Sequence, residues 1–422
     1  MQRARYPIQS GPARRPRKGT TVASGLLIVF CSLYLAACVA LPGTATPEAT
    51  ATPTQNVTVT LGPTVALPLD VPYLGIYSVF PDDLERVAAA GVSVVSVPPG
   101  TVEEMRMYLA AADALGLHVR LSLSPSFLDL DQERVGRYLD ALAPDETIVM
   151  WYLPEEPKDA EDHARWKRLY ELVKSRDPAG RPVGLYLARG ATVEYFREWA
   201  DTCDIFMMGA YPEYYDIPRA ALYTRVHNAS LVAAEHGMLT VAVPQFFDHE
   251  SILATVGKDA DEPRLHIGHP DAWEFRADAY TGWIAGASGL DWYSLKHAAP
   301  YPDLWDAMAA VVAELNELGP VLVEGTPGPD LALTILSGPG SVPSFGSMTE
   351  APIQIRTYRY EGELYILAVS LADAPAEVQL EGLPSSADEV TVLFEDRNVQ
   401  AEGGSMRDAF LPHAVHVYHL TR

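Results

Sequence analysis

Eight short apolar segments alternate with eight amphipathic helical patterns between residues 73 and 320, and this alternation constrains the fold more than any other feature. Several of the apolar segments are continuously hydrophobic, which is typical of strands that are covered on both faces. The expected strands are residues 73–79, 92–97, 117–123, 147–153, 182–188, 203–211, 238–246 and 288–295. This order over about 250 residues predicts an α/β fold, the (β/α)8 TIM barrel. An open doubly wound sheet is the alternative, but no glycine-rich nucleotide-binding turn follows the first strand.

The helices between these strands carry start and stop signals of their own. Thr101-Val102-Glu103-Glu104 is a capping box that opens a helix extending to Leu115. Pro81 and the two aspartates after it open the preceding helix, which Gly91 is placed to end. The other helices are expected at residues 130–142, 159–176, 192–200, 217–236, 271–286 and 301–318.

The pattern changes after Pro320. Short runs in which apolar and polar residues alternate, such as 353–360 and 363–371, are separated by turns rich in glycine, proline and aspartate. Such runs predict a small antiparallel β-sandwich. We therefore expect a barrel domain at residues 70–320 and a C-terminal β-sandwich domain at residues 321–422.

The N-terminal segment has the features of a targeting signal, which lies outside the fold. Six basic residues precede an uncharged stretch from Thr20 to Leu41. Leu35-Ala36-Ala37-Cys38 resembles the bacterial lipobox, which predicts a signal peptide at residues 1–37 and lipidation of Cys38 as the mature N-terminus. An uncleaved signal anchor is the alternative, because about 20 uncharged residues can span a bilayer. Both alternatives place the folded domains on the extracytoplasmic side of the cell membrane.

Composition narrows the range of partners. Residues 38–69 are rich in Thr, Pro and Ala, and we expect them to form a disordered tether. Only one of the three cysteines, Cys203, lies in the folded part, so an intrachain disulfide framework is excluded there. Loss of residues 1–37 would remove six basic residues and no acidic ones, which changes the formal charge from −24 to −30. This acidity argues against nucleic acid and suits a neutral or cationic ligand.

In (β/α)8 barrels, functional residues lie at the C-terminal ends of the strands and in the loops that follow. That rule selects Glu155 and Glu156 after the fourth strand, together with aromatic and amide side chains around them. The candidate substrate-binding residues are Trp151, Tyr211, Tyr214, Gln245, Phe247 and Trp292. Rings beside carboxylates and amides suit sugars, whose C–H faces stack on rings while their hydroxyls need hydrogen-bond partners. Ordinary core packing or a solvated turn is the alternative explanation for each residue taken alone.

The segment from 248 to 270 has no clear helix or strand pattern. A loop of this length is usually functional or disordered, and its place after the seventh strand would allow it to lie over the site as a lid. Its three histidines, His249, His266 and His269, match no tight metal-ligand spacing. We therefore expect no metal and no other cofactor.

A family resemblance adds to this interpretation. WYLPEEP (151–157) resembles the strand-four signature of the large clan of retaining glycosidase barrels, in which an Asn-Glu-Pro triplet supplies the general acid/base. By this resemblance Glu156 matches the acid, Glu155 stands at the position of the asparagine, and Tyr211 matches the strand-six tyrosine. Residues 269–295 look like the last helix and strand of uncharacterised glycoside-hydrolase-like barrels.

One position departs from the clan. The clan has a glutamate nucleophile at the end of strand seven, whereas this chain has Gln245, and an amide cannot form a glycosyl-enzyme. In a first mechanism, Glu156 is the acid and another rim carboxylate is the base or nucleophile. The candidates for that second group are Asp248, Glu250 and Asp291. In a second mechanism, similar to that of chitinase-like barrels, an acetamido group of the substrate is the nucleophile and the Glu155-Glu156 pair assists it. In a third, the site binds glycan without cleavage.

The resemblance implies a membrane-tethered, extracytoplasmic glycoside hydrolase that acts on poly- or oligosaccharide with Glu156 as general acid. Its expected partners are a carbohydrate and, through the N-terminal lipid or anchor, the membrane. A non-catalytic carbohydrate-binding surface lipoprotein and a structural or adhesion scaffold are the alternatives.

Overall fold

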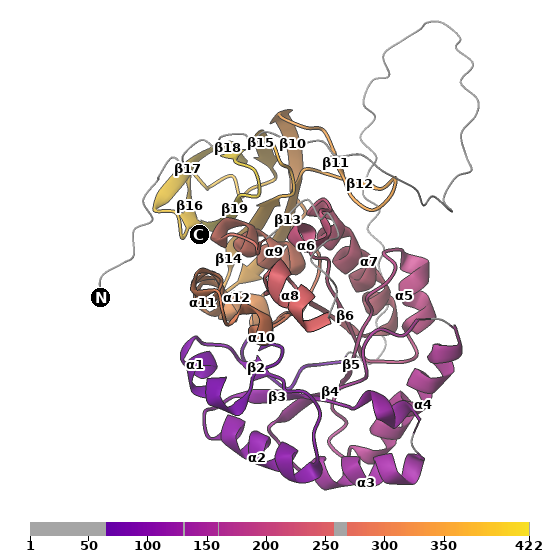
Figure 1. Ribbon diagram of the computed structural model, residues 1–422. Helices are drawn as coiled ribbons and strands as arrows, with labels where there is room; N and C mark the ends of the chain where they lie inside the picture. Colours follow the sequence, from indigo (N-terminus) through magenta and orange to yellow (C-terminus); the bar gives the residue numbers. More distant parts are fainter. Residues whose placement is uncertain (1–64, 130, 159, 257–267, 422) are drawn as a thin grey trace, which may run out of the picture. The chain divides into compact units, whose positions relative to one another are not determined.

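The computed structural model describes residues 65–129, 131–158, 160–256 and 268–421. Eight parallel strands close into a barrel in sequence order, so the expected (β/α)8 fold is confirmed (Figure 1). The strands are β1 (Tyr73–Ile76), β2 (Val94–Val95), β3 (His118–Ser122), β4 (Ile148–Tyr152), β5 (Val183–Tyr186), β6 (Ile205–Met208), β7 (Leu239–Ala242) and β8 (Gly289–Trp292). The predicted signal peptide, Cys38 and most of the predicted tether lie outside the described residues.

Helices form at the eight predicted places. The helices are α1 (Leu84–Ala89), α2 (Val102–Asp113), α3 (Gln132–Leu142), α4 (Ala160–Arg176), α5 (Val193–Trp199), α6 (Pro212–Tyr215), α7 (Ala220–His236), α8 (His249–Val256), α9 (Ala272–Ile284), α10 (Leu295–Ala298), α11 (Pro302–Glu317) and α12 (Gly319–Glu324). The short helices α6, α10 and α12 are additional to the predicted ones. The Thr101–Glu104 capping box forms at the start of α2 as expected. The segment after β7 differs from the prediction, because α8 forms within it; residues 257–267, which include His266, lie outside the described part.

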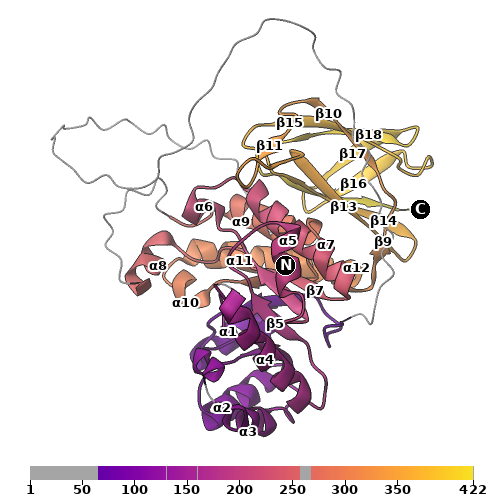
Figure 2. The ribbon, with the colours of Figure 1, turned by 90° about the vertical axis from the view of Figure 1, so that its right-hand side faces the viewer.

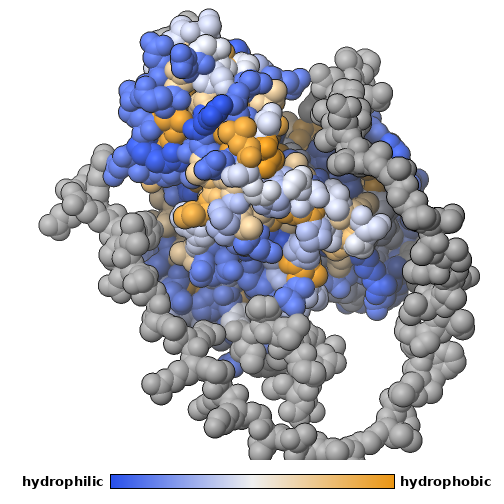
Figure 3. Space-filling view, turned by 90° about the horizontal axis from the view of Figure 1, so that it is seen from above, coloured by the Kyte–Doolittle hydropathy of each residue, from blue (hydrophilic) through white to orange (hydrophobic). Residues whose placement is uncertain are grey.

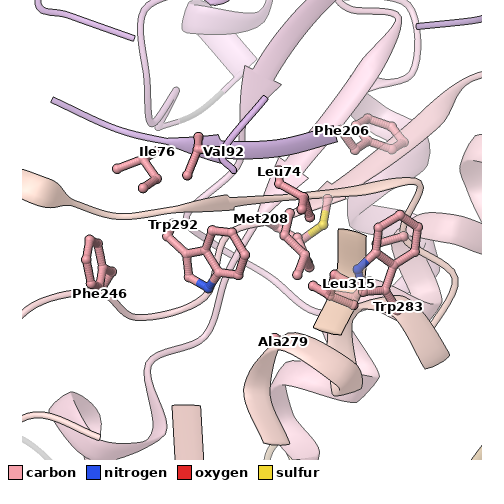
Figure 4. Close-up of a cluster of buried hydrophobic side chains, with 14 of the residues drawn as sticks. Leu74, Ile76, Val92, Phe206, Met208, Phe246, Ala279, Trp283, Trp292 and Leu315 are labelled. Atoms are coloured by element: carbon pink, nitrogen blue, oxygen red, sulfur yellow. The ribbon is translucent and has the colours of Figure 1, made fainter. Parts of the chain in front are cut away.

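Side chains of the barrel strands divide between two apolar layers, because successive residues of a strand point to opposite faces. One layer fills the barrel interior and includes Tyr73, Met150 and Met207. The other lies between the strands and the helices and includes Leu74, Trp151, Phe206 and Trp292; part of it is drawn in Figure 4. The face on which a side chain lies therefore decides whether it can reach the barrel mouth.

The C-terminal region forms an antiparallel sheet with the strand order β10-β15-β18-β17-β16-β19-β14-β13-β9. Its strands are β9 (Thr326–Pro327), β10 (Ala332–Ser337), β13 (Ile353–Tyr360), β14 (Glu363–Ser370), β15 (Ala376–Glu381), β16 (Glu389–Leu393), β17 (Arg397–Glu402), β18 (Ser405–Phe410) and β19 (Val415–Leu420). Ile366 of β14, Val378 of β15 and Phe410 of β18 share one core, so the sheet curls on itself. This confirms the expected β-sandwich; β11 (Val342–Pro343) and β12 (Thr349–Glu350) form a separate pair.

The described residues belong to one compact unit, in which the sheet packs on barrel helices (Figure 2). Leu367 of β14 and Val417 of β19 belong to the same apolar cluster as the helices around the barrel. Arg356 of β13 donates a hydrogen bond of 2.6 Å to the carbonyl oxygen of Trp283 in α9. Hydrophilic and hydrophobic residues are mixed on the face shown in Figure 3. Among the residues described, none of the helices is both long and apolar enough to cross a membrane.

Candidate active site

A cavity of about 270 Å³ lies at the C-terminal ends of the barrel strands. Its walls come from the segments that follow β1, β4, β5, β6, β7 and β8, which is where sites form in this fold. Two carboxylates line it, Glu155 and Glu156. The remaining wall is mostly aromatic, and the cavity is therefore a pocket with acids on one wall and rings around it.

The turn after β4 brings both glutamates to the cavity. On an extended strand, neighbouring side chains point to opposite faces, so only one of the two could face the barrel axis. Glu156 instead has a left-handed backbone with φ of 60°, which is uncommon for a residue other than glycine. Its amide donates a hydrogen bond of 3.2 Å to the carbonyl oxygen of Tyr186, which ties the turn to the end of β5.

Glu155 has the surroundings of a general acid. It is open to the cavity, yet protein atoms surround it on nearly every other side. Burial raises the pKa of Glu155 and the charge of Glu156 adds to this, while a hydrogen bond from Tyr152 and the charge of Arg120 oppose it. The Tyr152 hydroxyl donates to the Glu155 carboxylate at 2.7 Å, and it lies 2.7 Å from the hydroxyl of Tyr77. These surroundings favour Glu155 as the acid, whereas the family resemblance named Glu156.

A buried ion pair between Arg120 and Asp291 lies beneath the part of the pocket that Glu155 and Tyr77 line. The Arg120 guanidinium of β3 lies 3.9 Å from the ring centroids of both Tyr77 and Tyr152. Its Nε donates to Asp291 of β8 at 2.8 Å, and Tyr73 donates to the same carboxylate oxygen at 2.9 Å. Both charges are almost fully buried. Asp291 is therefore committed to neutralising Arg120 and does not line the cavity.

The opposite wall is a continuous group of rings. The ring centroids of Tyr211 and Phe247 lie 5.1 Å apart, those of Tyr214 and Phe247 lie 5.3 Å apart, and each pair meets edge to face. Phe247 also contacts Tyr293 at 6.0 Å, and Tyr293 contacts Tyr77 at 5.3 Å. The structure thus brings the predicted residues Tyr211, Tyr214 and Phe247 to the pocket.

Three other predicted residues do not line the pocket. The Gln245 carboxamide is buried, where its oxygen accepts from the amide of Tyr214 at 3.3 Å and its nitrogen donates to the carbonyl of Phe247 at 3.1 Å. It therefore joins the β6 and β7 loops. Trp151 and Trp292 lie in the layer between strands and helices, which differs from the expectation that they contact the ligand. The reason is the strand alternation, which points their neighbours Tyr152 and Tyr293 toward the barrel axis instead.

The remaining carboxylates proposed from the sequence are also elsewhere. Asp248 is buried beside His269 at 3.1 Å and accepts from the Tyr301 hydroxyl at 2.9 Å and from the amide of Glu250. Neither Asp248 nor Glu250 lines the cavity. Within the part of the chain that is described, the carboxylates of the pocket are Glu155 and Glu156 alone, and no three potential metal ligands gather.

Several pocket residues were not singled out from the sequence. Tyr77, Tyr186 and Tyr293 lie within predicted strands, but the sequence pattern does not show which residues of a barrel strand point inward, because that depends on strand register. Arg225 comes from α7, and no sequence pattern indicates that a helix residue reaches the barrel mouth.

Comparison with known proteins supports the fold. No family model matches the chain, and no curated protein matches it. Among solved structures, an α-amylase from Geobacillus thermoleovorans, complexed with acarbose, has a TM-score of 0.54 at 12% identity, covering 81% of this chain and 91% of the amylase. An Anoxybacillus α-amylase has a TM-score of 0.53 at 14% identity, covering 81% and 89%. Amy13B of Eubacterium rectale has a TM-score of 0.52 at 9% identity, covering 86% and 98%. At such identities the likeness establishes a shared architecture, a barrel followed by a C-terminal β-sheet domain.

Proposed function

We propose that this protein is a glycoside hydrolase in which Glu155 is the general acid. The observation that carries the proposal is the position of the Glu155 carboxyl, which lines the aromatic pocket beside Glu156 and accepts a hydrogen bond of 2.7 Å from the Tyr152 hydroxyl. Burial raises the pKa of this carboxyl, and a carboxyl with a raised pKa is better suited to protonate the oxygen of a glycosidic bond as it breaks. The barrel architecture, shared with α-amylases of which one is complexed with acarbose, is compatible with this chemistry.

The other steps fall to the rest of the pocket. Glu156 is the second carboxylate among the described lining residues, and it is the candidate base that activates water. If the sugar carries an N-acetyl group, Glu156 would instead orient that group for attack on the anomeric carbon. The rings of Tyr211, Phe247 and Tyr293 offer faces on which the C–H side of a sugar ring can stack.

Hydrolysis kinetics on two kinds of leaving group test the roles. A nitrophenolate leaves without protonation, whereas a sugar hydroxyl needs an acid. We expect Glu155→Gln to lose about 10²–10⁴-fold in kcat/KM on oligosaccharides and far less on nitrophenyl glycosides. Glu156→Gln should lose similarly on both, because a base acts on water in either case.

The matched control is Glu133→Gln, which removes an exposed carboxylate on α3 and should leave kcat/KM unchanged. In the wild type, activity on oligosaccharides should fall as pH rises through the raised pKa of Glu155, because the acid loses its proton. Unchanged oligosaccharide hydrolysis by Glu155→Gln would contradict its role as the acid.

A non-catalytic carbohydrate-binding protein is the second candidate. It is favoured by one observation, namely that the described wall opposite Glu155 and Glu156 carries rings and no carboxylate. Glycan binding by calorimetry without release of reducing ends would support this candidate. Cleavage of any bound glycan by the wild type would reject it.

We also propose that the protein is tethered to the outer side of the cell membrane through Cys38. The proposal rests on the lipobox-like Leu35-Ala36-Ala37-Cys38 and on the uncharged stretch around it. Cys38→Ala should abolish incorporation of radiolabelled palmitate and block removal of residues 1–37, as measured by gel mobility. Cys31→Ala, in the same apolar stretch, is the control and should be labelled normally. Membrane retention of an unprocessed, unlabelled wild type would favour the signal anchor instead.

A further inference from the structure

Among the lining residues that the structure describes, no free cation balances the acidic groups of the pocket. Glu156 projects its carboxylate from a left-handed turn, and no described side chain forms a hydrogen bond or ion pair with it. Arg225 is the cationic residue among the described lining, but its guanidinium donates to the carbonyl oxygens of Gly209, Leu187 and Arg189. Burial and the charge of Lys296 lower the pKa of His297, which disfavours its charged form.

The ring faces around these acids suit a positive charge. Four rings form one contiguous group: Tyr293 contacts Tyr77, Tyr211 and Phe247, and Tyr211 also contacts Phe247. Aromatic faces attract cations through the ring quadrupole, and rings with carboxylates make the sites that recognise ammonium groups. One of these rings, Tyr77, already contacts a cation beneath the pocket, where the Arg120 guanidinium lies between Tyr77 and Tyr152.

Tyr293 lies close to both the acidic and the aromatic residues of the pocket. It contacts Tyr77 and Phe247 as a ring, and the charges of Glu155 and Glu156 contribute, after burial, to raising its pKa to about 12. Tyr293, Glu155 and Glu156 all line the same cavity. An ammonium group in this cavity would be attracted by the charges of both carboxylates and by the aromatic face of Tyr293.

The charge of the whole chain acts in the same direction. The formal charge of −24 attracts polycations and repels polyanions over the distance of a Debye length. Such a net charge raises the local concentration of a cationic polymer around the molecule. The acidic pocket and the negative net charge of the chain therefore both favour a positively charged ligand.

We propose that the pocket recognises glycans that carry free amino groups, with the protonated amine bound between Glu156 and the rings of Tyr211 and Tyr293. The proposal names the substrate class of the proposed hydrolase. Cleavage of such glycans rests on the proposed function, whereas their binding does not. A free amine cannot act as the acetamido nucleophile, so in such a substrate Glu156 would pair with the ammonium group and serve as the base. Anionic glycans would be repelled, and N-acetylated or neutral glycans would lose the ion pair.

Calorimetric titration of the full chain with three oligosaccharides of equal length tests the proposal. The probes are glucosamine oligomers, their fully N-acetylated counterparts and cello-oligomers, which differ only in an amine, an acetamide or a hydroxyl at C2. The titrations are carried out at mildly acidic pH, below the pKa of the sugar amines, so that these amines are protonated. We expect the glucosamine oligomers to bind about tenfold or more tightly than either neutral series, with a preference that shrinks as salt is added.

Variants assign that preference to the pocket. Glu156→Gln should reduce the preference to near unity, while Glu133→Gln, the same change on the exposed face of α3, should leave it intact. Tyr293→Phe keeps the ring and should keep the preference, whereas Tyr293→Leu should reduce it several-fold. Equal or tighter binding of a neutral series by the wild type, or an unchanged preference in Glu156→Gln, would overturn the proposal.

The two proposals fail separately. Selective binding of glucosamine oligomers without release of reducing ends would uphold the amine site and reject hydrolysis. Cleavage of neutral oligomers by a protein that shows no preference for the amine would uphold hydrolysis and reject the amine site.

Discussion

At the scale of single residues, Glu156 has a left-handed backbone conformation, which a residue other than glycine adopts only at a cost in free energy. A residue with a Cβ atom in the left-handed region costs about 1–2 kcal/mol relative to the right-handed one, and such positions cluster at functional sites. Glycine has no such cost. We therefore expect Glu156→Gly to be about 1 kcal/mol more stable than Glu156→Ala in urea unfolding, although both variants lose the carboxylate.

The neighbouring residue provides the control, because the left-handed conformation is recorded for Glu156 and not for Glu155. Glu155→Gly should be less stable than Glu155→Ala, since the added chain entropy is not offset by relief of strain. The opposite order at position 156, with alanine more stable than glycine, would contradict a functional strain at this turn.

At the scale of elements, the turn between α4 and β5 shows how a buried ion pair fixes a strand of the barrel. Asp177 accepts from the amide and guanidinium of Arg181 and, at 3.1 Å, from Nε1 of Trp151. Arg181 also donates to the carbonyl oxygens of Asp145 and Ile148 at 2.6 and 3.2 Å, which joins the α3–β4 connection to this turn. Trp151 thus has a structural role in holding β4, the strand that presents the glutamates.

Removing the acid of this pair should be strongly destabilising. Asp177→Asn leaves the buried Arg181 charge without its partner, so we expect a loss of about 3–5 kcal/mol in the free energy of unfolding at neutral pH. Burial raises the pKa of Asp177, but the hydrogen bonds from Arg181 and Trp151 outweigh it and the pKa is lowered. The stabilisation is therefore complete above the unfolded pKa of about 3.9 and is lost as pH falls through the folded value.

The exposed pair of Asp140 and Arg176 provides the comparison, with an N–O distance of 2.9 Å. Asp140→Asn should cause a much smaller loss in urea unfolding, because water screens and solvates both groups. If the two substitutions were equally tolerated, the Asp177–Arg181 pair would not be what holds the turn.

Elements were predicted from the sequence more completely than the site. The strands and helices follow from local signals, such as the Thr101–Glu104 capping box, and from apolar periodicity. The rule that sites form at strand ends located Glu155, Glu156 and Tyr211. The direction of Trp151 depends on strand register, and the commitment of Asp291 to Arg120 depends on partners far away in the chain. Neither is encoded in a local pattern.

At the scale of the whole molecule, the barrel and the C-terminal sheet share one apolar cluster, although the chain changes character at Pro320. Leu367, Val369, Val415 and Val417 of the C-terminal sheet belong to the apolar cluster that also contains the barrel helices. Arg276 of α9 reinforces the contact with a hydrogen bond of 2.8 Å to the carbonyl oxygen of Val415. The barrel and the sandwich are distinct in topology and continuous in their packing.

This shared core predicts that the barrel does not fold stably alone. Burying one such side chain contributes about 1.5–3 kcal/mol, and four of them approach the total stability of an ordinary domain, about 5–15 kcal/mol. A chain that ends at Glu324 should therefore bind a hydrophobic dye and aggregate at a lower temperature than the full chain. A chain that begins at residue 65 is the control and should melt in the same single calorimetric transition as the full protein. Two separate transitions in the full chain, or a soluble truncated barrel with an unchanged melting temperature, would show that the two regions fold independently.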